Sequence, residues 1–135
     1  MIDLATEWFE IKQFKDKQSI TIASIVEQTW LQWYPWPMEI TYDQGSEFIG
    51  HEFQTMIQED YGIQTKPCTV QNSQANLVLE RIHQVLSEQI RMYELEKYYL
   101  NEDDPWAGIL SATFFAIHST YHTTLKAMPG QLVFG

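Results

Sequence analysis

The sequence contains one cysteine, few basic residues and no long apolar run. With Cys68 alone among its 135 residues, the chain forms no internal disulfide, which fits a reducing, intracellular compartment, and it has no cysteine–histidine spacing typical of zinc sites. No stretch approaches the roughly 18 apolar residues of a membrane span, and the first residues predict no signal peptide. Eight lysines and arginines against 18 aspartates and glutamates give a net charge of −10, which argues against a stand-alone nucleic-acid-binding protein because such a surface repels phosphate.

Apolar and aromatic residues are abundant enough for one packed domain. Hydrophobic residues make up 44% of the chain and five of them are tryptophans, so we expect a folded domain and not a disordered segment. Strand-like and helix-like patterns alternate along the chain. This alternation predicts an α/β domain in which helices pack on a partly parallel sheet.

The expected elements follow from the spacing of apolar residues and from turn residues. Strand patterns lie at 1–14, 38–42 and 63–68, helical patterns at 19–34, 47–60, 76–99 and 106–122, and a polar loop at 69–76. Ser19 is the candidate N-cap of the first helix. The residues expected to face inward are Ile22, Val26, Trp30 and Trp33 in the first helix, Phe48, Phe53, Met56 and Ile57 in the second, and Leu79, Ile82, Leu86, Ile90 and Tyr93 in the third.

Two carboxylates occupy positions that favour ligand binding. Asp43 follows an expected strand, where ligands gather in open α/β sheets, and Glu80 lies on the polar face of the third expected helix. Convergent carboxylates can hold two Mg²⁺ or Mn²⁺ ions for phosphodiester chemistry. Spacing alone also allows turn chemistry for Asp43 and a solvated charge for Glu80. The other residues on the face of Glu80 are His83, Gln84, Ser87 and Arg91.

Four segments occur in the order of a known family: "MIDLATEWFEI", "YPWPMEITYDQGSEFIGHEF", "NSQANLVLERIHQVL" and "PGQLVFG". In these segments the chain resembles the integrase catalytic core of gypsy-type long-terminal-repeat retrotransposons, relatives of retroviral integrases. The resemblance implies a ribonuclease H-like fold, with a mixed sheet flanked by helices. It also implies DNA integration by metal-dependent phosphodiester strand transfer, with DNA as the partner, a homo-oligomeric assembly, and the nucleus as the place of integration.

The resemblance also assigns roles to single residues. Asp43 and Glu80 match the family's second and third catalytic metal ligands, for Mg²⁺ or Mn²⁺, and Gly45 matches a glycine of the tight turn after Asp43. At position 7 the family favours glycine, where this chain has Glu7. The residues expected to approach DNA are Asn72, Gln74 and Asn76 of the 69–76 loop, and His83, Gln84 and Ser87 of the helix.

One ligand of the family's set has no counterpart in residues 1–135. The first catalytic Asp of the family lies on a central strand that would precede Met1, and Asp3 matches a position on the following strand instead. We therefore expect residues 1–135 to be a partial integrase catalytic core, truncated at the N-terminus from a longer polyprotein. We expect this fragment to be inactive as a polynucleotidyl transferase because it has only two of the family's three metal-binding carboxylates.

Other interpretations remain open at this stage. A non-catalytic remnant or a domesticated protein-interaction module would keep the fold without the reaction, and an unrelated helical interaction protein would lack the 38–42 strand. His118 and His122 could bind zinc, although polar packing is favoured, and Asp103 and Asp104 suit a helix cap before Pro105. The aromatic residues that could stack on bases, but are expected to pack in a core or interface, are Trp30, Trp33, Tyr34 and Trp36.

Overall fold

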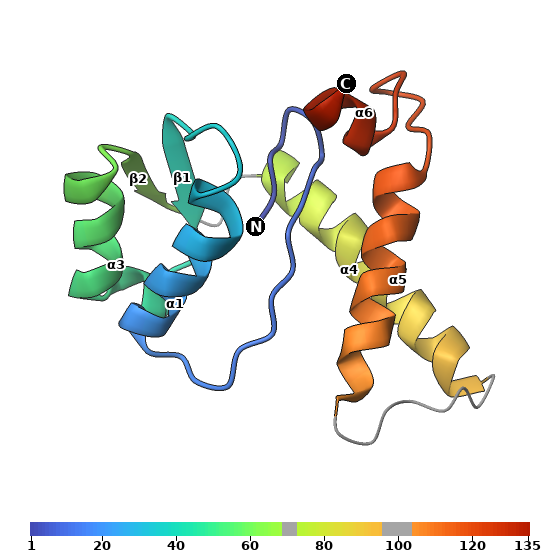
Figure 1. Cartoon of the computed structure of the whole chain (residues 1–135), viewed down its shortest axis with the longest axis horizontal. Coiled ribbons are helices and arrows are strands. Elements are labelled where there is room, and N and C mark those ends of the chain that lie inside the picture. Colours follow the sequence, from blue (N-terminus) through green and yellow to red (C-terminus); the bar gives the residue numbers. More distant parts are fainter. Residues whose placement is uncertain (69–72, 96–103) are drawn as a thin grey trace. The chain divides into compact units, whose positions relative to one another are not determined.

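The structure, a computed structural model, describes residues 1–68, 73–95 and 104–135. The chain divides into two compact units, coloured along the sequence in Figure 1. Unit 1 comprises Met1 and Lys12–Asn72, and unit 2 comprises Ile2–Ile11 and Ser73–Gly135. Among the described residues, no helix is both long and apolar enough to cross a membrane.

Unit 1 is built around a parallel pair of strands, β1 and β2. Their register places Glu39 opposite Gln64 and Tyr42 opposite Pro67, and the intervening helices make the crossover that parallel strands require. This pair confirms the strands expected at 38–42 and 63–68 and excludes the helical-protein interpretation. The elements in order are α1 (Ser19–Val26), η1 (Glu27–Leu31), β1 (Glu39–Tyr42), α2 (Ser46–Ile49), α3 (His51–Thr55), η2 (Met56–Asp60) and β2 (Gln64–Pro67).

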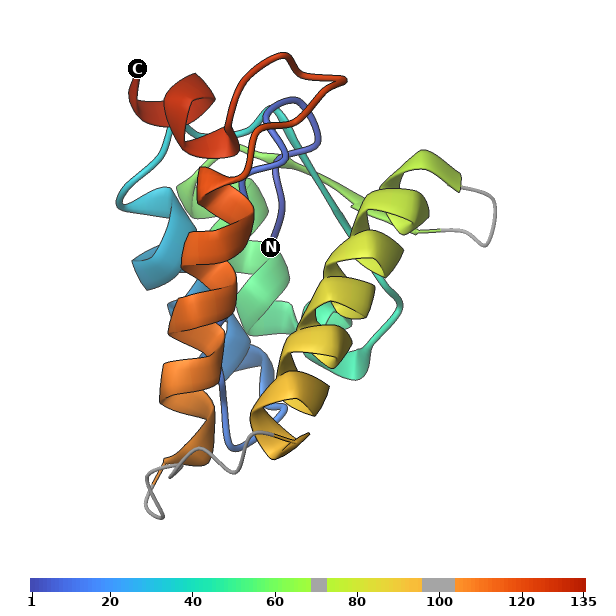
Figure 2. The ribbon, with the colours of Figure 1, turned by 90° about the vertical axis from the view of Figure 1, so that its right-hand side faces the viewer.

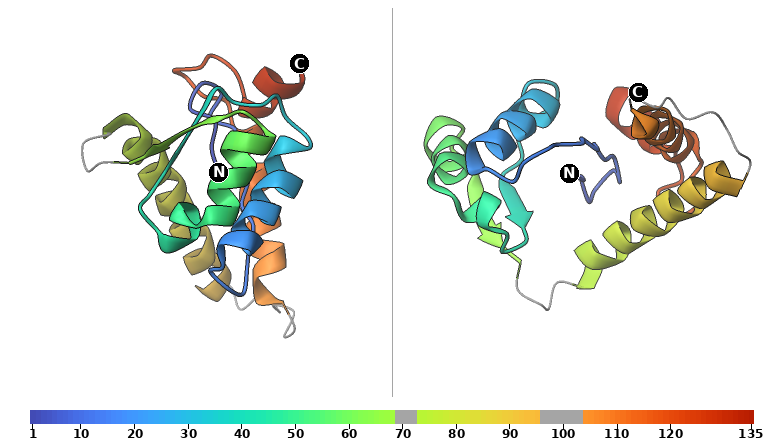
Figure 3. Two further views of the ribbon diagram at one scale, coloured as in Figure 1. Left: turned by 90° about the vertical axis from the view of Figure 1, so that its left-hand side faces the viewer. Right: turned by 90° about the horizontal axis from the view of Figure 1, so that it is seen from below.

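The core of unit 1 lies between α1, α3 and the two strands. Figure 3 shows α1 and α3 side by side, and these two helices are in contact. The buried cluster consists of Ile22, Ala23, Val26, Leu31, Phe53, Met56, Ile57 and Ile63, and Trp30, Tyr42 and Phe48 pack against it. The inward face predicted for the second helix is therefore confirmed.

The end of the first helix departs from the expected phase. The wider i→i+5 turn of η1 adds a residue to the helical repeat, so Leu31 takes the next core position and is 4% exposed. The prediction that Trp33 faces inward is wrong, because its side chain is 75% exposed.

Ser19 and Gly50 join α1 to α3 at close range. Gln18, not Ser19, is the N-cap residue of α1, and the Ser19 hydroxyl oxygen accepts the backbone N–H of Phe53 at 3.1 Å. Ser19 thus satisfies one of the free N–H groups at the start of α3, where the N-cap residue Gly50 has no side chain. Gly50 has an extended ψ of 146°, which divides the helix expected at 47–60 into α2 and α3.

Unit 2 combines a reversed N-terminal segment with three helices. The prediction of a strand over 1–14 is wrong: Asp3 accepts hydrogen bonds from Ala5 N–H and the Thr6 hydroxyl, so the chain turns back and leaves one bridge, between Ile2 and Phe9. The helices are α4 (Ser73–Leu95), α5 (Pro105–Ser119) and α6 (Pro129–Phe134). Thus α4 begins within the loop expected at 69–76, and α5 ends at Ser119, before the helix end predicted at His122.

Side chains of the N-terminal segment and of α5 form the core of unit 2. Figure 2 shows α4 and α5 as neighbours, and both α4 and α6 contact α5. Ile82 is buried as predicted, whereas Leu86 and Ile90 are half-buried, and the side chains of Leu79 and Tyr93 lie outside those described. The buried residues are Trp8, Phe9, Ile82, Ile109, Thr113, His118 and Pro129.

Candidate functional site

Asp43 lies at the carboxyl end of β1, as the sequence predicts. Its side chain is exposed, and its Oδ1 atom accepts the backbone N–H of Gly45 at 3.2 Å. This contact closes a short turn between β1 and α2, which is turn chemistry typical of aspartate. Among the described residues this is the one hydrogen bond of Asp43, so Oδ2 remains available to a ligand.

Gly45 is not needed for the turn in the way the resemblance implied. Its φ of −61° and ψ of 141° are extended values that any residue adopts. A Cβ atom there would meet only the carboxylate end of Glu47, at 2.8 Å, and that flexible side chain can move. The expected role of Gly45 is therefore wrong, and the Asp43 side chain itself organises the turn.

Glu80 lies on the exposed face of α4 in unit 2. His83, Gln84, Ser87 and Arg91 are exposed on the same helix, as the spacing predicts. Of the residues expected to approach DNA from a loop, Asn72 lies outside the described residues. Gln74 and Asn76 belong to α4, so the expectation that they lie in a loop is wrong, and their side chains are outside those described. Contact of any of these residues with DNA stays a prediction.

The oxygen donors of Asp43 and Glu80 suit a hard cation such as Mg²⁺ or Mn²⁺. Asp43 belongs to unit 1 and Glu80 to unit 2. Over the described ranges, no three histidine, cysteine, aspartate or glutamate side chains are grouped as a metal site. The chemistry of the donors thus fits the expected metal, and each carboxylate is accessible within its own unit.

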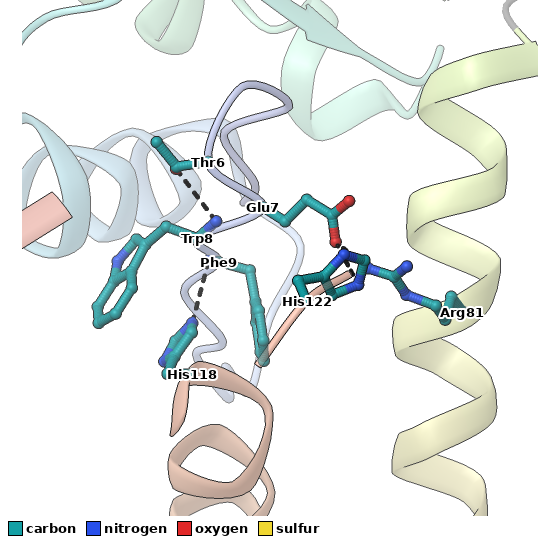
Figure 4. A network of polar contacts seen from close by, with 7 residues as sticks. All are labelled: Thr6, Glu7, Trp8, Phe9, Arg81, His118 and His122. Carbon is teal, nitrogen blue, oxygen red and sulfur yellow. Dashed lines mark hydrogen bonds and ion pairs between the residues drawn. The ribbon is translucent and has the colours of Figure 1, made fainter. Parts of the chain in front are cut away.

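A polar network that the sequence did not predict surrounds Glu7 in unit 2 (Figure 4). The Glu7 carboxylate pairs with the Arg81 guanidinium and lies 3.3 Å from His122 Nε2, although its side chain is only 14% exposed. Burial and the positive charge of Arg81 lower the pKa of His122. Glu7 has a φ of 57°, in the left-handed region that glycine adopts at less cost than glutamate.

His118 is a buried hydrogen-bond acceptor, as the favoured packing interpretation requires. Its Nε2 atom accepts the Phe9 backbone N–H at 3.3 Å, and its ring stacks on Trp8 at a centroid distance of 3.7 Å. Burial lowers the pKa of His118 to about 4. Because α5 ends at Ser119, His122 faces a different partner, Glu7, so polar packing is confirmed for both histidines.

Some of the remaining candidate residues have a structural place, and others are exposed on the surface. Asp104 directly precedes α5, as the cap interpretation requires, and Asp103 lies outside the described residues. Trp30 and Tyr34 pack against each other, with ring centroids 5.0 Å apart, in agreement with the packing interpretation. Trp33 and Trp36 lie outside the core, at 75% and 59% exposed, and donate their indole N–H groups to backbone carbonyls. Trp36 also packs edge-on against Tyr61, with ring centroids 5.0 Å apart, and packing of Trp33 and Trp36 in an interface stays a prediction.

The fold of the chain is similar to that of a retroviral integrase catalytic core. Among solved structures, the chain is similar to the catalytic core domain of BIV integrase, with 17% sequence identity and a TM-score of 0.76. The match covers 98% of this chain and 81% of that one. No protein-family model and no curated protein matches the sequence. At this identity the likeness establishes the fold, and within the described residues two parallel strands of its sheet are seen.

Proposed function

We propose that this chain is a partial catalytic core of a DNA integrase of the gypsy retrotransposon type. The observation that carries the proposal is the accessible carboxylate of Asp43 at the carboxyl end of β1, in a fold that matches an integrase core over 98% of the chain. Glu80, exposed on α4, would be the second ligand in residues 1–135. The partners would be element DNA, target DNA and further copies of the chain, and integration would take place in the nucleus.

The chain's own residues would hold and orient the reactants. Asp43 would present Oδ2 while Gly45 N–H keeps Oδ1 in place, and Glu80 would supply its carboxylate from the face it shares with His83 and Ser87. A bound pair of Mg²⁺ or Mn²⁺ ions supplies activation of the attacking hydroxyl and stabilisation of the leaving oxygen. The net charge of −10 repels DNA phosphates, and bound cations would reduce that repulsion at the site.

Residues 1–135 alone are expected to join no DNA strands. Two carboxylates hold two cations less firmly than three, so the geometry for in-line displacement is incomplete. The measurement is strand transfer of an element-end oligonucleotide into plasmid DNA with Mg²⁺ or Mn²⁺. Joined product that disappears in the Asp43→Asn variant would refute the incomplete-site interpretation.

Binding of Mn²⁺ to residues 1–135 tests whether the two carboxylates share one site. We expect weak binding, with a dissociation constant above about 0.1 mM. Paramagnetic broadening of amide signals by Mn²⁺ measures this binding. In a double-mutant cycle, Asp43→Asn and Glu80→Gln should each weaken binding, and together they should lose less than the sum by about 0.5 kcal/mol or more. Independent, additive losses would mean two unrelated surface carboxylates.

The chain offers matched controls for both substitutions. Asp16 is an exposed aspartate whose Oδ1 also accepts a backbone N–H two residues on, from Gln18 at 3.1 Å, so Asp16→Asn reproduces the local change at Asp43. Glu88 is exposed on the same helix as Glu80, which makes Glu88→Gln the second control. Neither control should change Mn²⁺ binding. An equal loss of Mn²⁺ affinity in the controls would show that Mn²⁺ responds to the overall negative charge of the chain and not to a defined site.

A non-catalytic protein-interaction module is the second candidate function. Three large apolar side chains of unit 1 are exposed close together in sequence: Trp33 at 75%, Trp36 at 59% and Met38 at 90%. Exposed large apolar side chains are typical of interaction surfaces where they form one patch. Mn²⁺ binding that is unaffected by both Asp43→Asn and Glu80→Gln would favour this candidate over the integrase proposal.

A further inference from the structure

A single side chain of α3, Gln54, connects the two ends of the turn that carries Asp43. The Gln54 Nε2 atom donates to the Tyr42 hydroxyl at 2.8 Å and to the Phe48 carbonyl oxygen at 2.6 Å. Tyr42 is the last residue of β1, directly before Asp43, and Phe48 lies in α2, beyond the turn. Gln54 therefore links the strand side and the helix side of the turn.

The hydrogen-bond partners of Gln54 fix the orientation of its amide group. Its Oε1 atom accepts from Gln58 Nε2 at 2.6 Å and from the Thr65 hydroxyl at 3.2 Å. The Phe48 carbonyl oxygen can only accept, so a flipped Gln54 amide would lose this contact. All four hydrogen-bonding positions of the half-buried Gln54 amide are thus occupied in one arrangement.

Aromatic packing holds the same two ends from the core side. The Tyr42 and Phe48 rings lie 5.8 Å apart, and each contacts the ring of Phe53, at 5.8 and 5.4 Å. Between these supports, the contact of Asp43 with Gly45 N–H sets the turn itself. Gln54 adds the only directional link among these contacts that reaches both Tyr42 and Phe48.

We propose that Gln54 is a positioning residue for Asp43. It does not touch the metal, and it acts by fixing the distance between Tyr42 and Phe48, and so the direction of the Asp43 carboxylate. A metal-binding carboxylate must be held to within roughly 0.5 Å of its productive place, and outer contacts of this kind commonly change metal affinity. This inference rests on the proposed function, because it needs Asp43 to bind a cation.

The test compares Gln54→Met with Gln58→Met in residues 1–135. Methionine keeps the length of the side chain and removes its hydrogen bonds. Gln58 belongs to the same network, through Gln54 and Thr65, but among the described residues it forms no hydrogen bond with Tyr42 or Phe48. We expect Gln54→Met to raise the Mn²⁺ dissociation constant roughly 10-fold and Gln58→Met to change it less than about 2-fold.

A second variant and a second readout guard against simple loss of folding. Tyr42→Phe removes one hydroxyl and keeps the ring packing, so it should weaken Mn²⁺ binding in the same direction by a smaller factor. Hydrogen exchange at Gly45 N–H, relative to the amides of α3, reports the turn without metal. We expect this relative exchange to quicken in Gln54→Met and to stay unchanged in Gln58→Met.

The outcomes separate the inference from the proposed function. If Asp43→Asn leaves Mn²⁺ binding unchanged, the proposed function fails and the inference falls with it. If Asp43→Asn abolishes binding while Gln54→Met stays within 2-fold of the original chain, only the inference on Gln54 is overturned. Equal losses in Gln54→Met and Gln58→Met would also overturn it, because the network and not the link across the turn would then be responsible.

Discussion

Replacing Gly50 with alanine is expected to lower the free energy of unfolding of unit 1 by about 2–3 kcal/mol. An added Cβ atom would lie 2.2 Å from both Cβ and Oγ of Ser19, far inside van der Waals contact. Relief requires α1 and α3 to separate, which would also break the hydrogen bond from Phe53 N–H to Ser19. Urea unfolding followed by amide signals of α1 and α3 measures this loss.

Gly45→Ala is the matched control for this steric effect. Gly45 is also the N-cap residue of a short helix with an extended ψ, but its added Cβ would meet only the mobile end of Glu47. We expect a change within about 0.5 kcal/mol, since alanine also reduces the entropy of the unfolded chain. Adding Ser19→Gly to Gly50→Ala should restore part of the stability. Equal losses at Gly45 and Gly50 would contradict the close approach of Ser19.

Unit 2 is expected to lose about 3 kcal/mol of stability between pH 7 and pH 4 through His118. The pKa of His118 falls to about 4 in the folded chain against an ordinary value of 6.5, because the ring is buried. Between these values the unfolded chain binds the proton and the folded chain does not, so stability falls as pH falls. The lowered pKa of His122 acts in the same direction.

The contribution of His118 is isolated by comparing pH profiles of variants. His118→Gln keeps an acceptor for Phe9 N–H but does not titrate, so its urea unfolding should depend less on pH between 6.5 and 4 than that of the original chain. His83→Gln, at an exposed position of the same unit, should leave the profile unchanged. Parallel profiles for the original chain and His118→Gln would show that carboxylates alone cause the acid sensitivity.

Local patterns predicted the elements that position the candidate site. The apolar run before Asp43 became β1, and the polar face with Glu80, Gln84 and Ser87 is exposed on α4. These predictions succeeded because strand ends and helix faces depend on residues close together in sequence. The strand expected over 1–14 failed because the Asp3 side chain favours a turn, which competes with extended structure.

The sequence by itself therefore determined the strands β1 and β2, the approximate places of α1, α3, α4 and α5, the end of β1 at Asp43 and the exposed face of α4. Only the tertiary structure decided that Ser19 supports α3 and not its own helix, and that Gly50 rather than Gly45 must lack a side chain. It also decided the pairing of Glu7 with Arg81, 74 residues away. Contacts between distant segments depend on how elements pack, and packing leaves no periodic signal in the residues that it brings together.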